Sequence, residues 1–263
     1  MRKIRPSAGR AKDGDHFIQK GYQFSLEDRP LHEVSVDPVV NTLETREQLM
    51  HAYNWYVDET QVLSRSEIAQ VLRDLMARSH LANVRLNLAI FRLATCCGLR
   101  ASEIGGLRLQ DVRVGIPRPH LVVRPKTAKG GRGRRVPLWW DEGTLRDIEA
   151  WRADRVACGA KLVAPFVCSL QKATLGQPLN RHVLRRRFHT ACRVLGWKRL
   201  RTLTIHHGRH SFVSHALAGG RTLAEVRLAA GHSSLLTTSV YLHVCREDEP
   251  VANDLFGRCP ENR

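Results

Sequence analysis

The spacing of apolar residues changes along this chain, and that change limits the folds it can form. Between residues 112 and 138 apolar and polar side chains alternate in the segments VRVGI, HLVVRP and GRRVPL, which predicts three short strands. Turn-forming residues separate these segments, at 117–119 and 129–133. On either side the apolar residues recur at helical spacing. The sequence therefore predicts a mainly α-helical fold with a small three-stranded antiparallel β-sheet.

Helix boundaries can be placed on both sides of the predicted sheet. Ser64 begins the clearest helix, because Glu67 three residues later completes a capping-box pattern before an apolar stripe. A helix over about 84–97 would end at Gly98, which suits a left-handed cap, and Ser102 would begin a short helix after the turn. The other predicted helices span residues 42–59, 141–158, 180–195, 205–218, 222–230 and 235–244.

Positive charge is concentrated in two long segments. The chain has 42 lysines and arginines against 25 acidic residues, a formal net charge of +17. No acidic residue lies between Asp111 and Asp141, or between Asp154 and Glu225. Such one-signed stretches favour a positive face that neutralises the phosphates of a nucleic acid. A solubilising surface or a weak polyanion binder would explain the charge alone, whereas interleaved apolar residues argue against a disordered basic tail.

The cysteines and the hydropathy pattern indicate a compartment. Seven cysteines occur without a C-x-x-C pair, and their odd number and scattered spacing favour reduced thiols inside a cell. The amino-terminal segment MRKIRPSAGRAKDGDHF lacks the apolar core of a secretory signal, and no uncharged stretch is long enough to span a bilayer. We therefore expect a cytoplasmic protein without a membrane partner.

A cluster of polar residues near the carboxyl end suits the cleavage of a phosphodiester without a metal. His206, Arg209, His232 and Tyr241 occur within 36 residues, and Arg100 lies in a turn upstream. The two arginines can bind non-bridging phosphate oxygens, a histidine can take a proton, and a tyrosine can form a covalent link. Because the ordinary pKa of tyrosine is about 10, we expect the cationic cluster to favour the phenolate.

Simpler interpretations exist for each of these residues. Arg100 alone is typical of a helix-end surface arginine, and Tyr241 alone is typical of a partly buried helix residue. A zinc site is suggested by four histidines in one predicted helix, His206, His207, His210 and His215. The glutamate of an H-E-x-x-H motif is absent and no C-x-x-C pair is present, so neither a metal nor another cofactor is expected. The joint occurrence of the residue types favours the catalytic interpretation.

Four segments together resemble the tyrosine recombinase (phage integrase) family in order and spacing: ATCCGLRASEIGGLRLQDV, KGGRGRRVPL, HHGRHSFVSHAL and AAGHSSLLTTSVYLHV. The resemblance runs from about Leu63 to Val244. A G-L-R-x-S-E match alone is weak, but its combination with H-x-x-R-H, G-H and a tyrosine nine residues later is specific. It implies the family's catalytic-domain fold and a site-specific recombinase or integrase that cleaves and rejoins DNA through a 3′-phosphotyrosyl intermediate.

The resemblance also implies roles for individual residues. Arg100 and His232 would bind the scissile phosphate, His206 and Arg209 would form the H-x-x-R pair, and Tyr241 would be the nucleophile. Three-residue spacing places His206 and Arg209 on one helical face.

The remaining site residues are assigned by the same resemblance or by charge. Lys129 would protonate the departing 5′ oxygen, with Lys126 as the alternative, and Glu103 and His210 would orient the catalytic arginines and histidine without touching phosphate. The basic surface predicts contacts with the DNA backbone from Arg132, Arg134, Arg135, Arg185 and Arg186.

The sequence divides into three parts on this interpretation. Residues 1–60 would be an arm or partial helical segment, 61–245 the catalytic domain and 246–263 a tail that could pack against a neighbouring subunit. About sixty residues are too few for the helical core-binding domain that family members carry before the catalytic domain. We therefore expect weak binding by the chain alone, and an accessory protein could supply the missing clamp.

Two classes of function remain open. The first is a recombinase that acts on double-stranded DNA as a homo-oligomer, expected to be a tetramer, with a type IB topoisomerase as a chemically related variant. The second is a non-catalytic DNA-binding regulator derived from a truncated recombinase.

Overall fold

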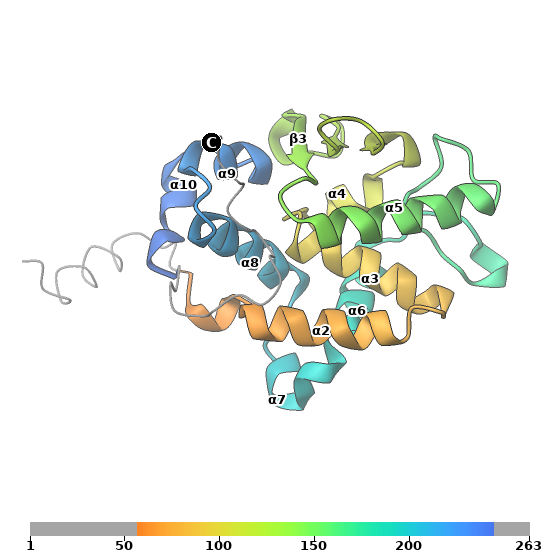
Figure 1. Ribbon diagram of the computed structural model, residues 1–263, viewed down its shortest axis with the longest axis horizontal. Helices are drawn as coiled ribbons and strands as arrows, with labels where there is room; N and C mark the ends of the chain where they lie inside the picture. Colours follow the sequence, from red (N-terminus) through yellow and green to blue (C-terminus); the bar gives the residue numbers. More distant parts are fainter. Residues whose placement is uncertain (1–56, 245–263) are drawn as a thin grey trace, which may run out of the picture. The chain divides into compact units, whose positions relative to one another are not determined.

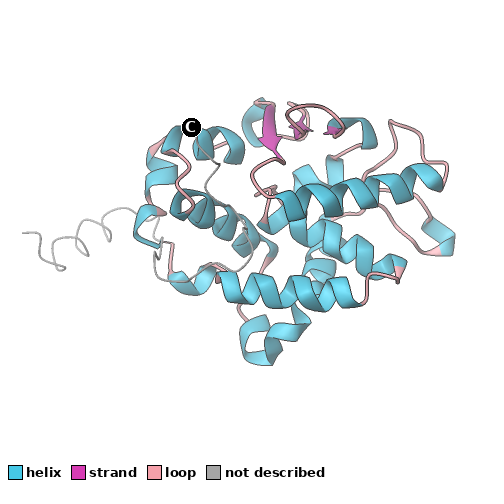
Figure 2. Cartoon of the chain, in the orientation of Figure 1, coloured by secondary structure: helices cyan, strands magenta, loops and turns pink. Residues whose placement is uncertain are grey.

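The computed structural model describes residues 57–244 of the protein. These residues form mainly helices with a three-stranded antiparallel sheet, as predicted (Figure 2). The α-helices are α2 Arg65–Ala77, α3 Ala82–Thr95, α4 Ala101–Gly106, α5 Glu142–Ala157, α6 Arg181–Ala191, α7 Gly196–Leu200, α8 Ile205–Ala218, α9 Leu223–Ala230 and α10 Leu236–Ser239. The strands are β1 Val112–Arg113, β2 His120–Val123 and β3 Arg134–Pro137. Short 3-10 helices are η1 Glu59–Gln61, η2 Leu109–Asp111, η3 Lys129–Gly131, η4 Lys172–Thr174, η5 Cys192–Leu195 and η6 Leu242–Val244.

The start of α2 confirms the predicted capping box. The Ser64 hydroxyl accepts a hydrogen bond from the Glu67 amide at 3.1 Å, and the Glu67 carboxylate accepts one from the Ser64 amide at 2.9 Å. Two amide groups at the helix start are thereby satisfied. The stripe that follows, Ile68, Val71, Leu72 and Leu75, is buried.

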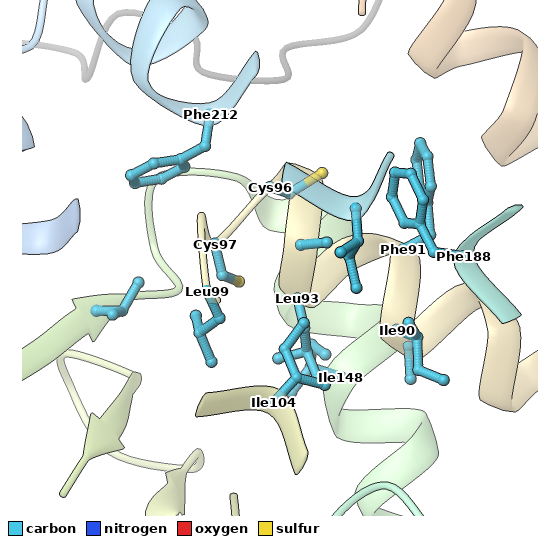
Figure 3. Packing of buried hydrophobic residues seen from close by; sticks show 14 of the residues in the cluster. Ile90, Phe91, Leu93, Cys96, Cys97, Leu99, Ile104, Ile148, Phe188 and Phe212 are labelled. Carbon is cyan, nitrogen blue, oxygen red and sulfur yellow. The ribbon is translucent and has the colours of Figure 1, made fainter. Parts of the chain in front are cut away.

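Helix α3 is central to the packing of the described residues. Helices α2, α5, α6 and α8 all pack against it (Figure 1), and its residues from Leu86 to Thr95 are all buried. Figure 3 shows the side chains of this core, in which the rings of Phe91 and Phe188 stack with centroids 5.7 Å apart. Burial on every side explains why α3 is apolar around most of its circumference.

Gly98 makes the turn from α3 to α4 possible. Its φ of +62° lies in the left-handed region, as the sequence predicts for a helix-ending glycine. A Cβ at this position would lie 2.4 Å from the ring of Phe212 on α8, which Figure 3 shows beside the turn. Glycine therefore allows α8 to approach the turn that carries Arg100.

The sheet has the order β1-β2-β3, and both pairs of strands are antiparallel. Leu121 of β2 lies opposite Val112 on one side and Val136 on the other. These three side chains are buried, so one face of the sheet belongs to the core. The period-two pattern thus correctly predicted the strands and the buried face.

Three helix predictions need correction. The helix predicted over 180–195 ends as an α-helix at Ala191 and continues as η5. The separate helix α7 was not predicted, because it lacks an apolar stripe and begins at Gly196, where φ is +81°. The helix predicted over 235–244 is divided into α10 and η6, because its threonines and serine are poor helix formers. Residues 42–56 of the first predicted helix lie outside the described residues, and its last three residues do not form an α-helix.

A buried arginine joins α3 to α5. The Arg92 guanidinium donates hydrogen bonds to Asp147 at 2.7 Å, to Asp141 at 3.1 Å and to the Thr144 hydroxyl at 3.3 Å. Its side chain is 6% exposed, so these charges depend on one another for compensation.

Replacing Arg92 should destabilise the fold strongly. In Arg92→Met the carboxylates of Asp141 and Asp147 lose their buried cation, so we expect the free energy of unfolding to fall by about 3–5 kcal/mol. Urea unfolding measures this change, with Arg146→Met on the exposed side of α5 as the control, expected within about 0.5 kcal/mol of the starting protein. Equal effects of the two substitutions would contradict a compensating role for Arg92.

Candidate active site

Several segments carry the side chains that the sequence singles out. They are the residue before α4 (Arg100), α8 (His206, Arg209 and His210), the loop after α9 (His232), the turn between α10 and η6 (Tyr241) and the connection between β2 and β3 (Lys126 and Lys129). Helix α9 packs against α8, α10 and β3 (Figure 1), which brings the carboxyl-terminal segments to the sheet and to the turn before α4.

Arg209 is buried between two of these segments. Its Nη1 donates to the carbonyl of Gly98 at 2.6 Å and its Nη2 donates to the carbonyl of Ala230 at 2.5 Å. Burial, followed by the positive charges of Arg100 and Arg134, lowers the pKa of Arg209 to about 9. The guanidinium therefore keeps its charge at neutral pH and is fixed by backbone atoms on both sides.

Arg100 is held by Glu103, one turn into α4. The carboxylate of Glu103 accepts from Nη1 of Arg100 at 3.2 Å and from its backbone amide at 2.8 Å. The Glu103 side chain is fully buried, whereas that of Arg100 remains 21% exposed. Glu103 therefore holds Arg100 and leaves part of its guanidinium accessible to an anion; an orienting role in catalysis stays a prediction.

His232 lies directly after the left-handed residue Gly231 that ends α9. Its Nδ1 is 3.0 Å from the hydroxyl of Thr238 on α10, and its ring stacks on that of Tyr241 with centroids 6.1 Å apart. Desolvation and the positive charge of the neighbouring arginines lower the pKa of His232 to about 3. The imidazole is therefore neutral at neutral pH and can donate one hydrogen bond without adding charge.

Tyr241 is buried and contacts a histidine directly. Its hydroxyl lies 2.7 Å from Nδ1 of His210, and the two rings stack with centroids 5.7 Å apart. Burial and the charges of the nearby histidines lower the pKa of His210 to about 4, so its imidazole is neutral. His210, expected to orient the catalytic arginines and histidine, contacts the predicted nucleophile.

The expectation that the cationic cluster favours the phenolate needs correction. Burial raises the pKa of Tyr241, and the opposing charges of Arg209 and Arg100 do not overcome that effect. The side chain is therefore a phenol at neutral pH. A reaction at this hydroxyl requires a neighbouring group that takes its proton.

His206 occupies the rim of the cluster, at the start of α8. It is an exposed residue that lines an open pocket with Arg185, Arg186 and His189 of α6. Partial desolvation and the charges of Arg185 and Arg209 lower its pKa. His206 thus lies where the buried cluster meets the basic surface of α6.

The two candidate lysines are not brought into this cluster. Lys129 begins η3 and Lys126 lies two residues before Ala128 in the same connection, and both are exposed. Within residues 57–244 neither ammonium makes a hydrogen bond or an ion pair, and neither is among the charges that shift the pKa values of the cluster. The choice between them stays open.

Four of the five arginines predicted to contact the DNA backbone are exposed: Arg132, Arg135, Arg185 and Arg186. Arg134 differs, because its side chain is only 8% exposed and forms an ion pair with Glu103. The buried ion pair leaves little of the Arg134 guanidinium available for the predicted contact with the DNA backbone. A usable signal was present in the sequence: Arg134 lies two residues before the buried Val136, so strand alternation places both on the inner face of β3.

Neither a membrane span nor a metal cluster is found among the described residues. No helix within 57–244 combines the length and apolar character needed to cross a bilayer. The histidines of α8 are not part of any group of three or more histidine, cysteine or carboxylate side chains placed to hold a metal ion in that part of the chain.

Curated relatives are named as tyrosine recombinases. The chain is 33% identical to XerC of Rhodospirillum centenum over 159 residues, which cover 60% of this chain and 42% of the relative. It is 35% identical to XerC of Myxococcus xanthus over 162 residues (60% and 50%) and 29% identical to XerD of Yersinia pestis over 208 residues (72% and 64%). The chain thus spans between 42% and 64% of the length of these relatives.

Solved structures share the fold. The XerA recombinase superposes with a TM-score of 0.56 at 19% identity, covering 69% of this chain and 58% of that one. The XerH site-specific recombinase, solved in a pre-cleavage complex with its difH substrate, superposes with a TM-score of 0.55 at 24% identity, covering 73% and 53%.

The family model described as "Phage integrase family" matches residues 62–247 of this chain. That range is more than half of the 263 residues and contains every residue of the cluster. The chain therefore belongs to the phage integrase family.

Proposed function

We propose that the chain is a tyrosine site-specific recombinase that cleaves and rejoins double-stranded DNA through a 3′-phosphotyrosyl intermediate. The observation that carries this proposal is the meeting of a buried phenol, a neutral imidazole bonded to it and two arginines, Arg209 and Arg100, whose charges act on the phenol. Such a set provides a nucleophile, a proton acceptor and stabilisation for an anionic transition state.

The proposed cleavage is a single displacement at phosphorus. The Tyr241 oxygen attacks, the bond between phosphorus and the 5′ oxygen breaks, and the products are a 3′-phosphotyrosyl link and a free 5′-hydroxyl. Attack by a 5′-hydroxyl from a partner strand reverses the step and joins a new pair of ends. Because the link retains the energy of the broken bond, the reaction needs no nucleotide hydrolysis.

His210 is the group best placed to take the phenolic proton. With its own proton on Nε2, the neutral imidazole accepts the Tyr241 hydrogen bond at Nδ1 over 2.7 Å. The proton moves to His210 as the oxygen attacks. This role replaces the orienting role that the family resemblance implied for the residue.

Arg100, Arg209 and His232 would bind the phosphate. Arg209 is fixed by two carbonyls and still carries N–H groups that those bonds do not use, and Arg100 is partly exposed. Preformed cations in a buried site stabilise developing charge better than mobile ones, because they need no reorganisation. The proposed residues therefore supply the charge stabilisation that a metal ion provides in other nucleases.

The departing 5′ oxygen needs a proton donor, which we propose is Lys129 rather than Lys126. Both lie in the exposed connection between β2 and β3. Contact with a scissile phosphate would require this connection to fold over the bound duplex.

The proposed partner is the backbone of double-stranded DNA. The exposed Arg132, Arg135, Arg185 and Arg186 flank the buried cluster, and phosphate contacts from such residues position a duplex without reading its sequence. A homo-oligomer, a tetramer on DNA, follows from the need to exchange strands between two duplexes. An accessory clamp protein and a cytoplasmic location stay predictions.

The proposed catalytic domain is residues 61–245, between an arm of residues 1–60 and a tail of residues 246–263. The family match over 62–247 lies close to these bounds. The assembled cluster, with its phenol bonded to a neutral imidazole, does not favour the alternative of a non-catalytic regulator.

A covalent protein–DNA adduct tests the proposed function. A duplex with a nick just beyond the cleaved phosphate lets the short 5′-hydroxyl fragment dissociate, so that the covalent intermediate accumulates. The protein, incubated with this duplex in the presence of a chelator, should become attached to the 3′ phosphate at the cleavage site, because neither a metal nor a nucleotide is required. The Tyr241→Phe variant should give no adduct while it still binds the duplex. Equal adduct yields from both proteins on a denaturing gel would contradict the assignment of Tyr241.

Substituting His210 should slow the cleavage step. A glutamine at this position can hold the phenol but cannot take its proton, so we expect a loss of about 10²–10⁴ in the single-turnover rate at neutral pH. The rate of His210→Gln should rise steeply with pH, since ionised phenol needs no acceptor. The pKa of His210 is about 4, so protonation of this residue should not slow the unsubstituted protein between about pH 8 and about pH 6. If the cleavage rate of His210→Gln changed with pH in the same way as that of the unsubstituted protein, His210 would not be the proton acceptor.

An altered leaving group distinguishes Lys129 from Lys126 as the proton donor. In a duplex with sulfur in place of the 5′ bridging oxygen, the sulfur can leave as a thiolate without being protonated. This duplex should therefore restore cleavage by Lys129→Met to nearly the starting rate. Lys126→Met is the matched variant and should lose little activity on either duplex. Rescue confined to Lys126→Met would transfer the role to Lys126.

A further inference from the structure

Arg134 lies on the inner face of β3, apart from the exposed arginines of the same hairpin. Its side chain is 8% exposed, whereas Arg132 and Arg135 are exposed residues. A buried cation must be compensated by neighbouring groups, so the contacts of Arg134 indicate what it does.

The guanidinium of Arg134 takes up both oxygens of Glu103. Nη1 donates to Oε1 at 2.7 Å and Nη2 donates to Oε2 at 2.9 Å, which is the two-bond geometry that arginine and a carboxylate favour. Burial alone would raise the pKa of Glu103, but the hydrogen bonds and charge of Arg134 lower it below its ordinary value. Glu103 is therefore an anion at neutral pH, and Arg134 is its main counter-ion.

Arg100 shares the same carboxylate through a longer contact. Its Nη1 lies 3.2 Å from Oε1, compared with 2.7 Å for Arg134, and its guanidinium remains partly exposed. Because Arg134 occupies both oxygens, Glu103 orients Arg100 without neutralising it. In the absence of Arg134 the carboxylate would have Arg100 as its nearest cation and would draw that guanidinium into a closed ion pair.

Arg134 also fixes the turn that carries His232. Its Nε donates to the carbonyl of Ala229 in the last turn of α9 at 2.7 Å. A Cβ at Gly231, where φ is +69°, would lie 2.8–3.0 Å from the Arg134 side chain, so the two groups are in tight contact. The next carbonyl, that of Ala230, is held by Arg209. The end of α9 is thus tied to β3 and to α8 immediately before His232.

We infer that Arg134 is a positioning residue for DNA cleavage: it satisfies Glu103 so that Arg100 stays available to the phosphate, and it fixes the turn that presents His232. The inference rests on the proposed recombinase function. Arg134 itself does not touch the DNA on this account.

The test compares single-turnover cleavage of a nicked duplex by the full chain and its Arg134→Gln variant. At saturating DNA the variant should cleave about a hundredfold more slowly, the loss expected for one charge-stabilising donor. Its dissociation constant for the duplex should change little, because the exposed arginines proposed to hold the DNA backbone are unchanged. Arg146→Gln, on the exposed side of α5, is the control and should cleave at the starting rate.

A second substitution separates positioning from general loss of structure. If Glu103 captures Arg100 when Arg134 is absent, then Glu103→Gln added to Arg134→Gln should raise the cleavage rate about tenfold over Arg134→Gln alone. A merely structural role predicts that the double variant is as slow or slower. If Arg134→Gln does not fold, Arg134→Lys is used in its place. Its cleavage rate should lie between that of the unsubstituted protein and that of Tyr241→Phe.

Four results would overturn the inference. The first two are cleavage by Arg134→Gln within about twofold of the rate of the unsubstituted protein, and weaker binding with an unchanged cleavage rate. The others are a double variant that cleaves no faster than Arg134→Gln, and an Arg134→Lys variant that cleaves as fast as the unsubstituted protein. No adduct with the unsubstituted protein would refute the proposed function instead. In that case a crystal structure of Arg134→Gln still tests the positioning: the Arg100 guanidinium should close onto the Glu103 carboxylate, and an unchanged contact between these two side chains would contradict the inference.

Discussion

The arrangement of the cluster depends on a guanidinium buried between backbone carbonyls. Arg209 joins α8 to the turn after α3 through Gly98 and to the end of α9 through Ala230, so three distant parts of the chain meet at one side chain. Burying a cation is costly unless it is well bonded. Close packing makes these bonds possible, because Gly98 lets Phe212 and therefore α8 reach the turn. A guanidinium fixed in this way would need little reorganisation to stabilise the transition state of the proposed reaction.

Burial, more than positive charge, determines the protonation of the histidines and the tyrosine of this cluster. Burial, followed by the charges of neighbouring histidines and arginines, keeps His210 and His232 neutral, with pKa values of about 4 and about 3. Burial keeps Tyr241 a phenol in spite of Arg209 and Arg100. In the proposed reaction the phenol is inactive until its proton is taken, and His210 would be the acceptor. The same contact would then protect the phenol in the absence of a substrate and activate it during attack.

Sequence patterns predicted the features that depend on local spacing. The capping box at Ser64, the left-handed Gly98 and the three strands were predicted because each is determined by residues close in the chain. The contact of His210 with Tyr241 was not predicted, because it joins residues 31 positions apart through the packing of α8 against η6. Arg134 was placed on the surface by its charge, although strand alternation with the buried Val136 indicated an inward position. Net charge describes a surface only on average, and alternation is the more reliable guide for one residue.

The central claim is that these side chains enclose one phosphate. A crystal structure of Tyr241→Phe bound to an uncleaved duplex tests it most directly. We predict one backbone phosphate within hydrogen-bond distance of the guanidinium groups of Arg100 and Arg209 and of the His232 ring, with residue 241 opposite the 5′ oxygen. A duplex seated on the arginines of α6 and the β-hairpin, with every phosphate outside that cluster, would contradict the account.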